Sequence, residues 1–260
     1  MDKMKILNEL QSHYDYSVEL FGEEKVLAVM LYGSQNYGLA TEASDFDTCA
    51  LIVPSVDDII LGKQKKSKHY KLDNGIMNVK DYRLAFENYL KGGFTFLETL
   101  YTDYYIVNPY FKNEFNQLRE MADEIVNYTY STGFYSSVKG LLNNIIKNYN
   151  KHKDTDDKDE IVTINKRIRQ FFRIYYFMKD FQDTEDFKWS LDANKNNRSK
   201  LYEEIAQATK DLKVYNKVED FINAELDSSV FIPKEKNINN KAEEKLEVLV
   251  LKIFDKIYNP

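Results

Sequence analysis

Two short apolar runs with a polar segment between them constrain the fold of this chain most. Val26–Leu31 reads VLAVML, and Phe46–Val53 reads FDTCALIV. A short apolar run of this kind is typical of a strand buried in a sheet. The residues between the runs, 33–44, are rich in Gly, Ser, Asn and Thr, which is typical of a loop. We therefore expect a strand, a polar loop and a second strand in direct succession.

The rest of the first hundred residues predicts a mixture of helices and strands. Apolar residues recur at helical spacing over 2–20, which predicts an N-terminal helix. Residues 69–82 predict a β-hairpin, because two strand-like segments flank the turn Asp73-Asn74-Gly75. Helices are expected over 83–91 and 94–100.

From about Glu114 onward the pattern is almost entirely helical. The clearest helix covers 161–180, where one apolar stripe is made by Ile161, Ile164, Ile168, Phe171, Tyr175 and Met178. Other helices are expected over 132–150, 198–210, 214–226 and 240–257. The expected fold class is thus α+β: a small mixed-sheet domain over 1–112, followed by an α-helical domain over 113–260 that packs against it.

Composition limits the class of protein and of partner. Of the 260 residues, 43% are hydrophobic and 30% are charged, as in ordinary globular proteins. The net charge of −6 argues against a protein that coats nucleic acid through bulk charge, although a local basic groove is compatible with it. The single cysteine, Cys49, permits no internal disulfide and is expected to be a small buried residue. The three histidines show no metal-ligand spacing.

No segment of the sequence predicts a signal peptide or a membrane span. The N-terminal segment is amphipathic and lacks the apolar core of a signal peptide. No run approaches the roughly 18 apolar residues that a membrane-spanning helix needs. We expect a soluble, cytoplasmic protein that does not interact with a membrane.

Two aspartates stand at the start of the second strand. In an extended chain, residues i and i+2 point to the same side, so Asp45 and Asp47 lie side by side while Phe46 turns into the core. Two adjacent carboxylates repel each other unless a cation or protons lie between them. Mg²⁺ prefers carboxylate oxygens and completes its shell with water and substrate phosphates. The pair is either a metal site or an exposed strand end with two solvated carboxylates.

A glycine and a serine open the loop that precedes these aspartates. Gly33 permits close approach of the backbone to an anion. The Ser34 hydroxyl and neighbouring N–H groups can bind phosphate oxygens. Taken alone, the Gly-Ser pair is equally compatible with an ordinary strand-to-loop turn.

The succession of strand, G-S, loop, D-x-D and strand resembles the nucleotidyltransferase superfamily of the DNA polymerase beta type. The segment GSQNYGLATEASDFD is most similar to the signature of predicted nucleotidyltransferases of an RNA repair pathway, which occur in bacteria and phages. Tyr37, Gly38, Thr41 and Ser44 match that signature. The similarity is weaker over 80–100, where Gly93-Phe94 replaces the usual Asn-Pro, and thin beyond.

The resemblance implies nucleotidyl transfer. A nucleoside triphosphate would bind through Mg²⁺ or Mn²⁺, an acceptor hydroxyl would attack the α phosphate, and pyrophosphate would leave. The acceptor could belong to an RNA end, a protein or a small molecule. The resemblance makes Asp45 and Asp47 the metal ligands and Gly33 and Ser34 the residues that hold the terminal phosphates. Further candidates for nucleotide binding are Gln35, Tyr37, Ser44, Lys166 and Arg173.

Three of these candidates have a second interpretation. Tyr37 could stack on a base or simply close the loop. Lys166 and Arg173 lie opposite the apolar stripe of their helix, where they could meet the triphosphate or form a solvated helix face.

Active members of the superfamily usually carry a third acidic residue on a neighbouring strand. Here that strand is expected over 76–82, and Asn78, or Ile76 if the register slips, would pair with the two aspartates. Neither is acidic. Asp81 is the candidate for a third catalytic carboxylate, although an aspartate at a helix start is also a routine N-cap. Asp73, Glu98 or no residue at all are the alternatives, and a missing third acid favours a degenerate fold that binds nucleotide or protein without catalysis.

Overall fold

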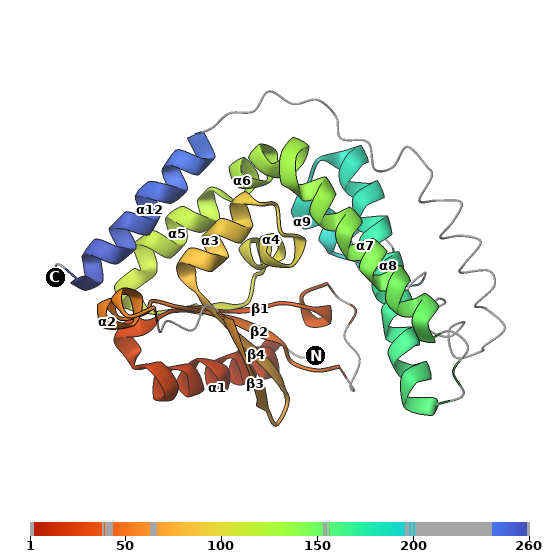
Figure 1. The fold of residues 1–260 in the computed structure, drawn as a ribbon, viewed down its shortest axis with the longest axis horizontal. Coiled ribbons are helices and arrows are strands. Elements are labelled where there is room, and N and C mark those ends of the chain that lie inside the picture. Colours follow the sequence, from red (N-terminus) through yellow and green to blue (C-terminus); the bar gives the residue numbers. More distant parts are fainter. Residues whose placement is uncertain are drawn as a thin grey trace. The chain divides into compact units, whose positions relative to one another are not determined.

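The computed structural model describes residues 3–37, 39, 44–62, 67–152, 155, 157–195, 198, 200 and 241–258. It confirms the α+β class, with a mixed five-stranded sheet in the first part of the chain and helices in the second (Figure 1). The chain divides into two compact units. The first comprises Met1–Phe134 together with Lys236–Pro260, and the second comprises Tyr135–Glu235.

The sheet has the strand order β3-β4-β2-β1-β5. Its strands are β1 (Val26–Leu31), β2 (Thr48–Ile52), β3 (Ser67–Leu72), β4 (Gly75–Asp81) and β5 (Tyr105–Val107). The β2–β4 pair is parallel, and the other pairs are antiparallel. The two predicted strands and the predicted hairpin are therefore confirmed.

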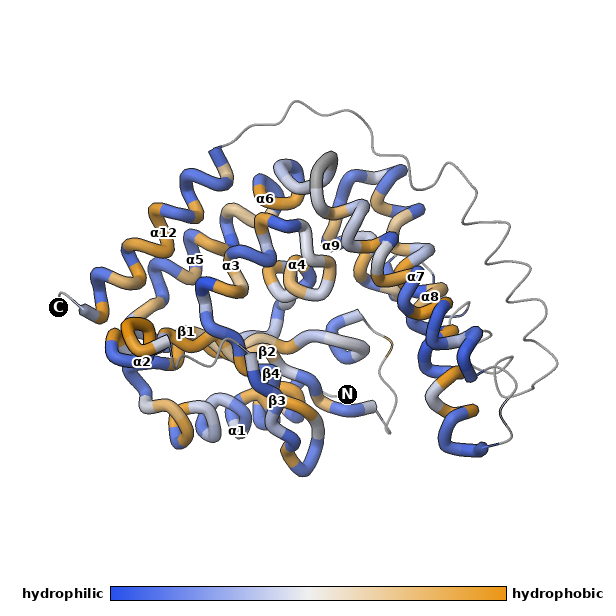
Figure 2. The backbone as a smooth tube through the Cα atoms, viewed as in Figure 1, coloured by the Kyte–Doolittle hydropathy of each residue, from blue (hydrophilic) through white to orange (hydrophobic). Residues whose placement is uncertain are grey.

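Helices cover both faces of this sheet. Helix α1 (Lys3–Phe21) lies on one face, and α3 (Tyr82–Leu90) and α4 (Phe94–Tyr101) lie on the other (Figure 1). All six residues of β1 are buried, and the strand is apolar along its length (Figure 2). A strand buried on both faces needs this continuous apolar run. The core beneath α1 contains Ile6, Leu10, Tyr14, Val29, Leu31, Phe46, Ala50, Ile52, Met77 and Val79.

The division into units differs from the expected boundary at 112–113. Helices α5 (Lys112–Glu120) and α6 (Ala122–Thr129) belong to the first unit. Their apolar side chains, among them Phe115 and Ile125, are buried there. This burial holds α5 and α6 in the same unit as the sheet.

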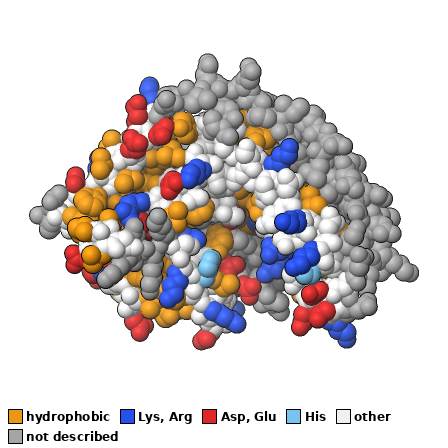
Figure 3. Space-filling view, viewed as in Figure 1, with side chains coloured by type: hydrophobic (Ala, Val, Ile, Leu, Met, Phe, Trp, Pro, Cys, Tyr) orange, Lys and Arg blue, Asp and Glu red, His pale blue; other side chains and the backbone are white. Residues whose placement is uncertain are grey.

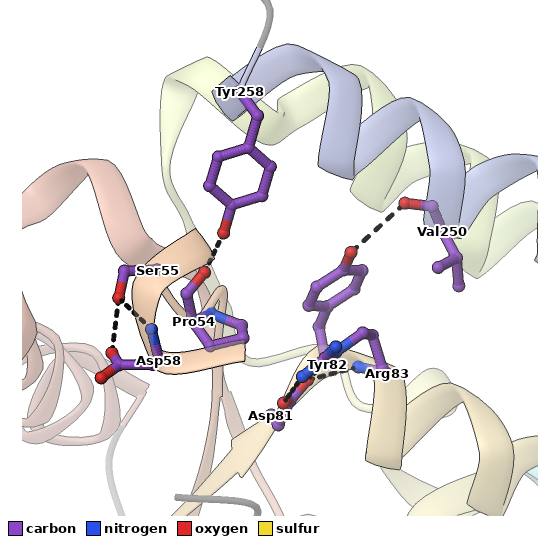
Figure 4. Close-up of polar contacts among 8 residues, drawn as sticks. All are labelled: Pro54, Ser55, Asp58, Asp81, Tyr82, Arg83, Val250 and Tyr258. Atoms are coloured by element: carbon purple, nitrogen blue, oxygen red, sulfur yellow. Dashed lines mark hydrogen bonds and ion pairs between the residues drawn. The ribbon is translucent and has the colours of Figure 1, made fainter. Parts of the chain in front are cut away.

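The C-terminal helix α12 (Lys241–Tyr258) also belongs to the first unit. The Tyr82 hydroxyl donates to the carbonyl of Val250 at 3.3 Å, and the Tyr258 hydroxyl donates to the carbonyl of Pro54 (Figure 4). Pro54 directly precedes Ser55, the N-cap of the short helix α2 (Val56–Ile60). These bonds join α12 to the rest of the first unit.

The second unit contains α7 (Tyr135–His152), α8 (Lys158–Thr184) and α9 (Phe187–Leu191). Asp157 caps α8 by accepting from the backbone N–H groups of Asp159 and Glu160. The predicted apolar stripe of α8 is buried from Ile164 to Met178. The helices expected over 198–210 and 214–226 lie, apart from residues 198 and 200, outside the described residues. Among the described helices, none combines the length and apolar character that crossing a membrane requires.

Candidate functional site

The loop after β1 turns on a glycine with a left-handed backbone. Gly33 has φ 82°, a conformation that side chains strongly disfavour. The short 3₁₀ helix η2 (Ser34–Tyr37) follows at once. The Asn36 N–H donates to the Gly33 carbonyl at 2.9 Å, and the Leu39 N–H donates to the Ser34 carbonyl at 3.1 Å. Ser34 is half-buried at the start of this turn.

The two aspartates flank a buried phenylalanine, as the sequence predicts. Phe46 is 1% exposed and belongs to the core beneath α1. Asp45 is exposed and Asp47 is half-buried. We call residues 45–47 the DFD segment. Because Phe46 occupies the α1 side, the two carboxylates belong to the other side of the segment.

Gly33 and Asp47 lie next to each other. A Cβ atom placed on Gly33 would be 3.6 Å from Asp47 Oδ2. The backbone supports this approach, because the Tyr32 N–H donates to the Asp47 carbonyl at 3.1 Å. The fold therefore brings the Gly-Ser turn and the second aspartate together.

The residue nearest to the place of a third carboxylate is an amide. The parallel pair of β2 and β4 sets Cys49 opposite Asn78 and Thr48 opposite Met77. Cys49 lies two residues beyond Asp47, so Asn78 shares the face of Asp47. Continuing the register by one residue sets Ile76 opposite Asp47. Both positions are the ones that the sequence analysis predicts, and neither carries an acid.

Asn78 is joined to a tyrosine that the sequence analysis missed. Its Nδ2 donates to the Tyr32 hydroxyl. Burial, with the Asp47 carboxylate nearby, raises the pKa of Tyr32 above its usual value, so the phenol is neutral at physiological pH. The available signal was position: Tyr32 directly follows the buried strand and directly precedes Gly33. Beside Asp47 the site thus presents a neutral amide and a neutral phenol.

Asp81 does not join the aspartate pair, contrary to expectation. It pairs in register with Ile52, five residues beyond Asp47, which is about 16 Å along a strand at ~3.3 Å per residue. Its carboxylate instead caps α3, accepting from the Arg83 N–H at 3.0 Å, and forms an ion pair with the Arg83 guanidinium at 2.6 Å (Figure 4). Asp81 is therefore an N-cap. Asp73, the other turn candidate, is exposed between β3 and β4.

Tyr37 closes the loop. Its side chain is only 1% exposed, and its hydroxyl donates to the carboxylate of Glu98, which is also 1% exposed. The bond ties η2 to α4. A ring buried in this way is not placed to stack on a base, so Tyr37 and Glu98 have structural roles.

Gln35 is the polar residue of the turn with the most unusual surroundings. It is 7% exposed, and both its amide oxygen and its amide nitrogen are buried. Neither atom has a hydrogen-bond partner among the described residues. A buried amide in this situation costs about 1–3 kcal/mol, and native proteins usually satisfy it. Gln35 is therefore a suitable group for contact with a polar ligand at the turn.

The remaining candidates are placed as follows. Ser44 is half-buried and directly precedes the DFD segment. Lys166 is exposed and Arg173 half-buried on α8, which belongs to the second unit. Their contact with a triphosphate stays a prediction. On the part of the first unit seen in Figure 3, acidic and basic side chains are interspersed among apolar ones.

The donor set of the site fits a magnesium ion that is shared with a substrate. Among the described residues, no group of three or more His, Cys, Asp or Glu side chains could hold a metal. A fully protein-made metal cage is therefore not found there. Mg²⁺ commonly uses only one or two protein carboxylates and takes its other ligands from water and phosphates. Asp45 and Asp47 meet that requirement.

Comparison of the chain with models of known protein families gave no match. Comparison with curated proteins gave no match either.

Proposed function

We propose that this protein is a Mg²⁺-dependent nucleotidyltransferase that moves a nucleoside monophosphate from a nucleoside triphosphate to an acceptor hydroxyl. The observation that supports the proposal is that Gly33 lies beside Asp47, so that a Cβ atom on Gly33 would be 3.6 Å from Asp47 Oδ2. This arrangement sets a turn suited to phosphates beside a carboxylate suited to a divalent cation. The resemblance of 33–47 to polymerase beta-type nucleotidyltransferases supports the same chemistry.

The chain's own residues would act mainly by positioning. Asp45 and Asp47 would hold the metal ion, which supplies charge stabilisation at the phosphates when bound. The glycine at 33 lets the turn approach an anion without a side chain in the way, and Ser34 would donate its hydroxyl to a terminal phosphate. Gln35 would offer its buried amide to the same ligand.

The proposed reaction is a substitution at the α phosphorus. The acceptor oxygen forms a bond to that phosphorus while the bond to the bridging oxygen of the β phosphate breaks. Pyrophosphate leaves with the bonding electrons, and the proton of the acceptor hydroxyl passes to solvent. An RNA end or a protein hydroxyl would be suitable as acceptor.

A second function is favoured by one specific observation, the amide at Asn78. Two carboxylates and a neutral amide carry less negative charge than three carboxylates, so they suit one divalent cation better than two. A site of this kind could bind the metal–triphosphate complex without transferring the nucleotide. The protein would then be a nucleotide-binding module.

Thermal unfolding distinguishes a protein with either of these functions from a protein that has no nucleotide site. At least one nucleoside triphosphate should raise the Tm of the wild type, and only when Mg²⁺ is present. The shift should vanish in Asp45→Ala/Asp47→Ala and persist in Asp73→Asn, which removes a nearby exposed carboxylate. No shift with any triphosphate would contradict both functions, and a shift without pyrophosphate release would leave the binding module.

A further inference from the structure

A partly buried chain of hydrogen bonds lies behind the DFD segment, on the face of the sheet that α1 covers. His13 of α1 is 1% exposed. Its Nδ1 is 2.7 Å from Thr48 Oγ1, and its Nε2 is 3.0 Å from Asn74 Oδ1. Thr48 directly follows Asp47, and Asn74 lies in the turn between β3 and β4. One imidazole thus connects a helix, a strand and a hairpin turn.

The direction of each hydrogen bond follows from the end of the chain. Asn74 Nδ2 donates to the Glu9 carboxylate, so Asn74 Oδ1 is the acceptor that faces His13. His13 Nε2 then carries a proton, and in the neutral ring Nδ1 accepts from the Thr48 hydroxyl. A neutral imidazole satisfies both contacts. Burial also lowers the pKa of His13, in agreement with the neutral form.

Phe46 is held by the same elements. Its backbone N–H donates to the Asn74 carbonyl at 2.8 Å. The His13 ring packs edge-on against the Phe46 ring, with 5.3 Å between the centroids. A Cβ atom on Gly75 would be only 2.0 Å from the Phe46 carbonyl oxygen, so the hairpin turn needs glycine in order to approach this closely. Helix α1 and the hairpin therefore hold Phe46, the residue between the two aspartates, in place.

We propose that His13 is a positioning residue for the aspartate pair, acting through Thr48 and Asn74. This inference rests on the proposed function, because it assigns the hydrogen-bond chain a purpose at the metal–triphosphate site. His13 is not catalytic, since its ring lies on the α1 side of the sheet and the carboxylates belong to the other side. The DFD segment precedes β2, and two backbone hydrogen bonds hold it, from the Tyr32 N–H to the Asp47 carbonyl and from the Phe46 N–H to the Asn74 carbonyl. The hydrogen-bond chain through His13 adds a side-chain constraint to these backbone bonds.

The chemistry of the network agrees with positioning rather than with packing alone. A buried polar network can often be replaced by apolar groups of the same shape with little loss of stability. What a fully satisfied network adds is a defined geometry. At a site that must hold a metal ion and a triphosphate, a displacement of about 1 Å is enough to lower the rate strongly.

The test compares Thr48→Val with Thr48→Ser. Valine keeps the shape of threonine and removes the hydroxyl that donates to His13, whereas serine keeps the hydroxyl. These variants are preferable to His13→Leu, which can fail to fold. Two quantities are measured in each full-length protein: amide hydrogen exchange at 45–48 without metal, and binding of Mn²⁺ alone.

In Thr48→Val, exchange at 45–48 should become about 10-fold faster and Mn²⁺ binding about 10-fold weaker, as the loss of one good hydrogen bond would produce. Thr48→Ser should resemble the wild type in both. Unchanged exchange in Thr48→Val would overturn the inference, as would faster exchange with unchanged Mn²⁺ binding. Wild-type protein that binds no Mn²⁺ even with a nucleoside triphosphate present would instead contradict the proposed function, and exchange alone would then decide whether the network positions the segment.

Discussion

Gly33 and Asp47 face each other across the loop that joins β1 to β2. A Cβ atom on Gly33 would be 3.6 Å from Asp47 Oδ2, and the φ angle of Gly33 is 82°. The short distance shows that position 33 borders the Asp47 carboxylate. The positive φ angle shows that glycine is the residue that fits there without strain.

Gly33→Ala should weaken both the fold and the site. The left-handed φ should cost about 1–2 kcal/mol of unfolding free energy, and the added methyl group would touch Asp47. We expect weaker binding of the Mg²⁺–nucleotide complex, measured by calorimetry beside urea unfolding. Gly62→Ala is the matched control, because Gly62 also has a positive φ, 63°, with nothing within 4 Å of a Cβ. Equal effects of the two variants on nucleotide binding would contradict a role for Gly33.

Asn78→Asp should add the third carboxylate to the face of Asp47. The exchange keeps the shape of the side chain, and the Tyr32 hydroxyl can donate to the new carboxylate in place of accepting from the amide. We expect a second bound Mn²⁺ per protein and a several-fold faster nucleotide transfer. Asn78→Ala is the control that removes the amide without adding charge. If Asn78→Asp binds no more Mn²⁺ than the wild type, Asn78 does not occupy the third position.

Asp81→Ala should affect stability and not the site. It removes the N-cap of α3 and one partner of the Arg83 ion pair, at a cost of about 1–2 kcal/mol. Urea unfolding measures that loss, and calorimetry should give an unchanged affinity for the Mg²⁺–nucleotide complex. A large loss of affinity in folded Asp81→Ala would restore Asp81 as a site residue.

Stability should depend on the protonation of His13. Burial lowers the pKa of His13 in the folded protein, whereas the unfolded chain binds the proton near pH 6.5. Between the folded and the unfolded pKa the unfolded state holds more protons, so the free energy of unfolding should fall as the pH drops below about 6.5.

Urea unfolding at several pH values between 7.5 and 5.5 measures this dependence. His13→Gln should remove the part of the slope that His13 contributes, whereas His69→Gln, at an exposed histidine of β3, should leave it intact. An identical slope in wild type and His13→Gln would show that His13 is not buried in its neutral form.

The parts of the fold that local sequence encodes could be predicted. The apolar run of β1 and the hairpin turn at Asp73-Asn74 each carry their signal within a few residues. Strand β5 has only three residues, all half-buried, and forms because β1 offers it an edge. The return of α12 to the first unit depends on contacts such as that of Tyr258 with Pro54. No local sequence pattern predicts a contact between residues as distant in the chain as Tyr258 and Pro54.

The candidate site, like the fold, could be predicted only where neighbouring residues in the sequence determine it. Alternation along β4 was enough to predict that Asn78 shares the face of Asp47. Placing Asp81 required the register of β2 against β4, which the spacing of residues does not give. The burial of Tyr37 depends on Glu98, and the network of His13 depends on Thr48 and Asn74. Each of these pairs meets only after the sheet and its helices assemble.

Asp47 is the residue on which the proposed nucleotidyl transfer depends most directly. The direct measurement is to incubate the protein with each α-labelled nucleoside triphosphate, Mg²⁺ or Mn²⁺, total RNA and cell protein, and to follow label in macromolecules together with pyrophosphate. We predict transfer by the wild type and by Asp73→Asn, and none by Asp47→Asn. Nuclease or protease sensitivity of the product would then identify the acceptor. Nucleotide binding without any transfer, or transfer that persists in Asp47→Asn, would contradict the claim.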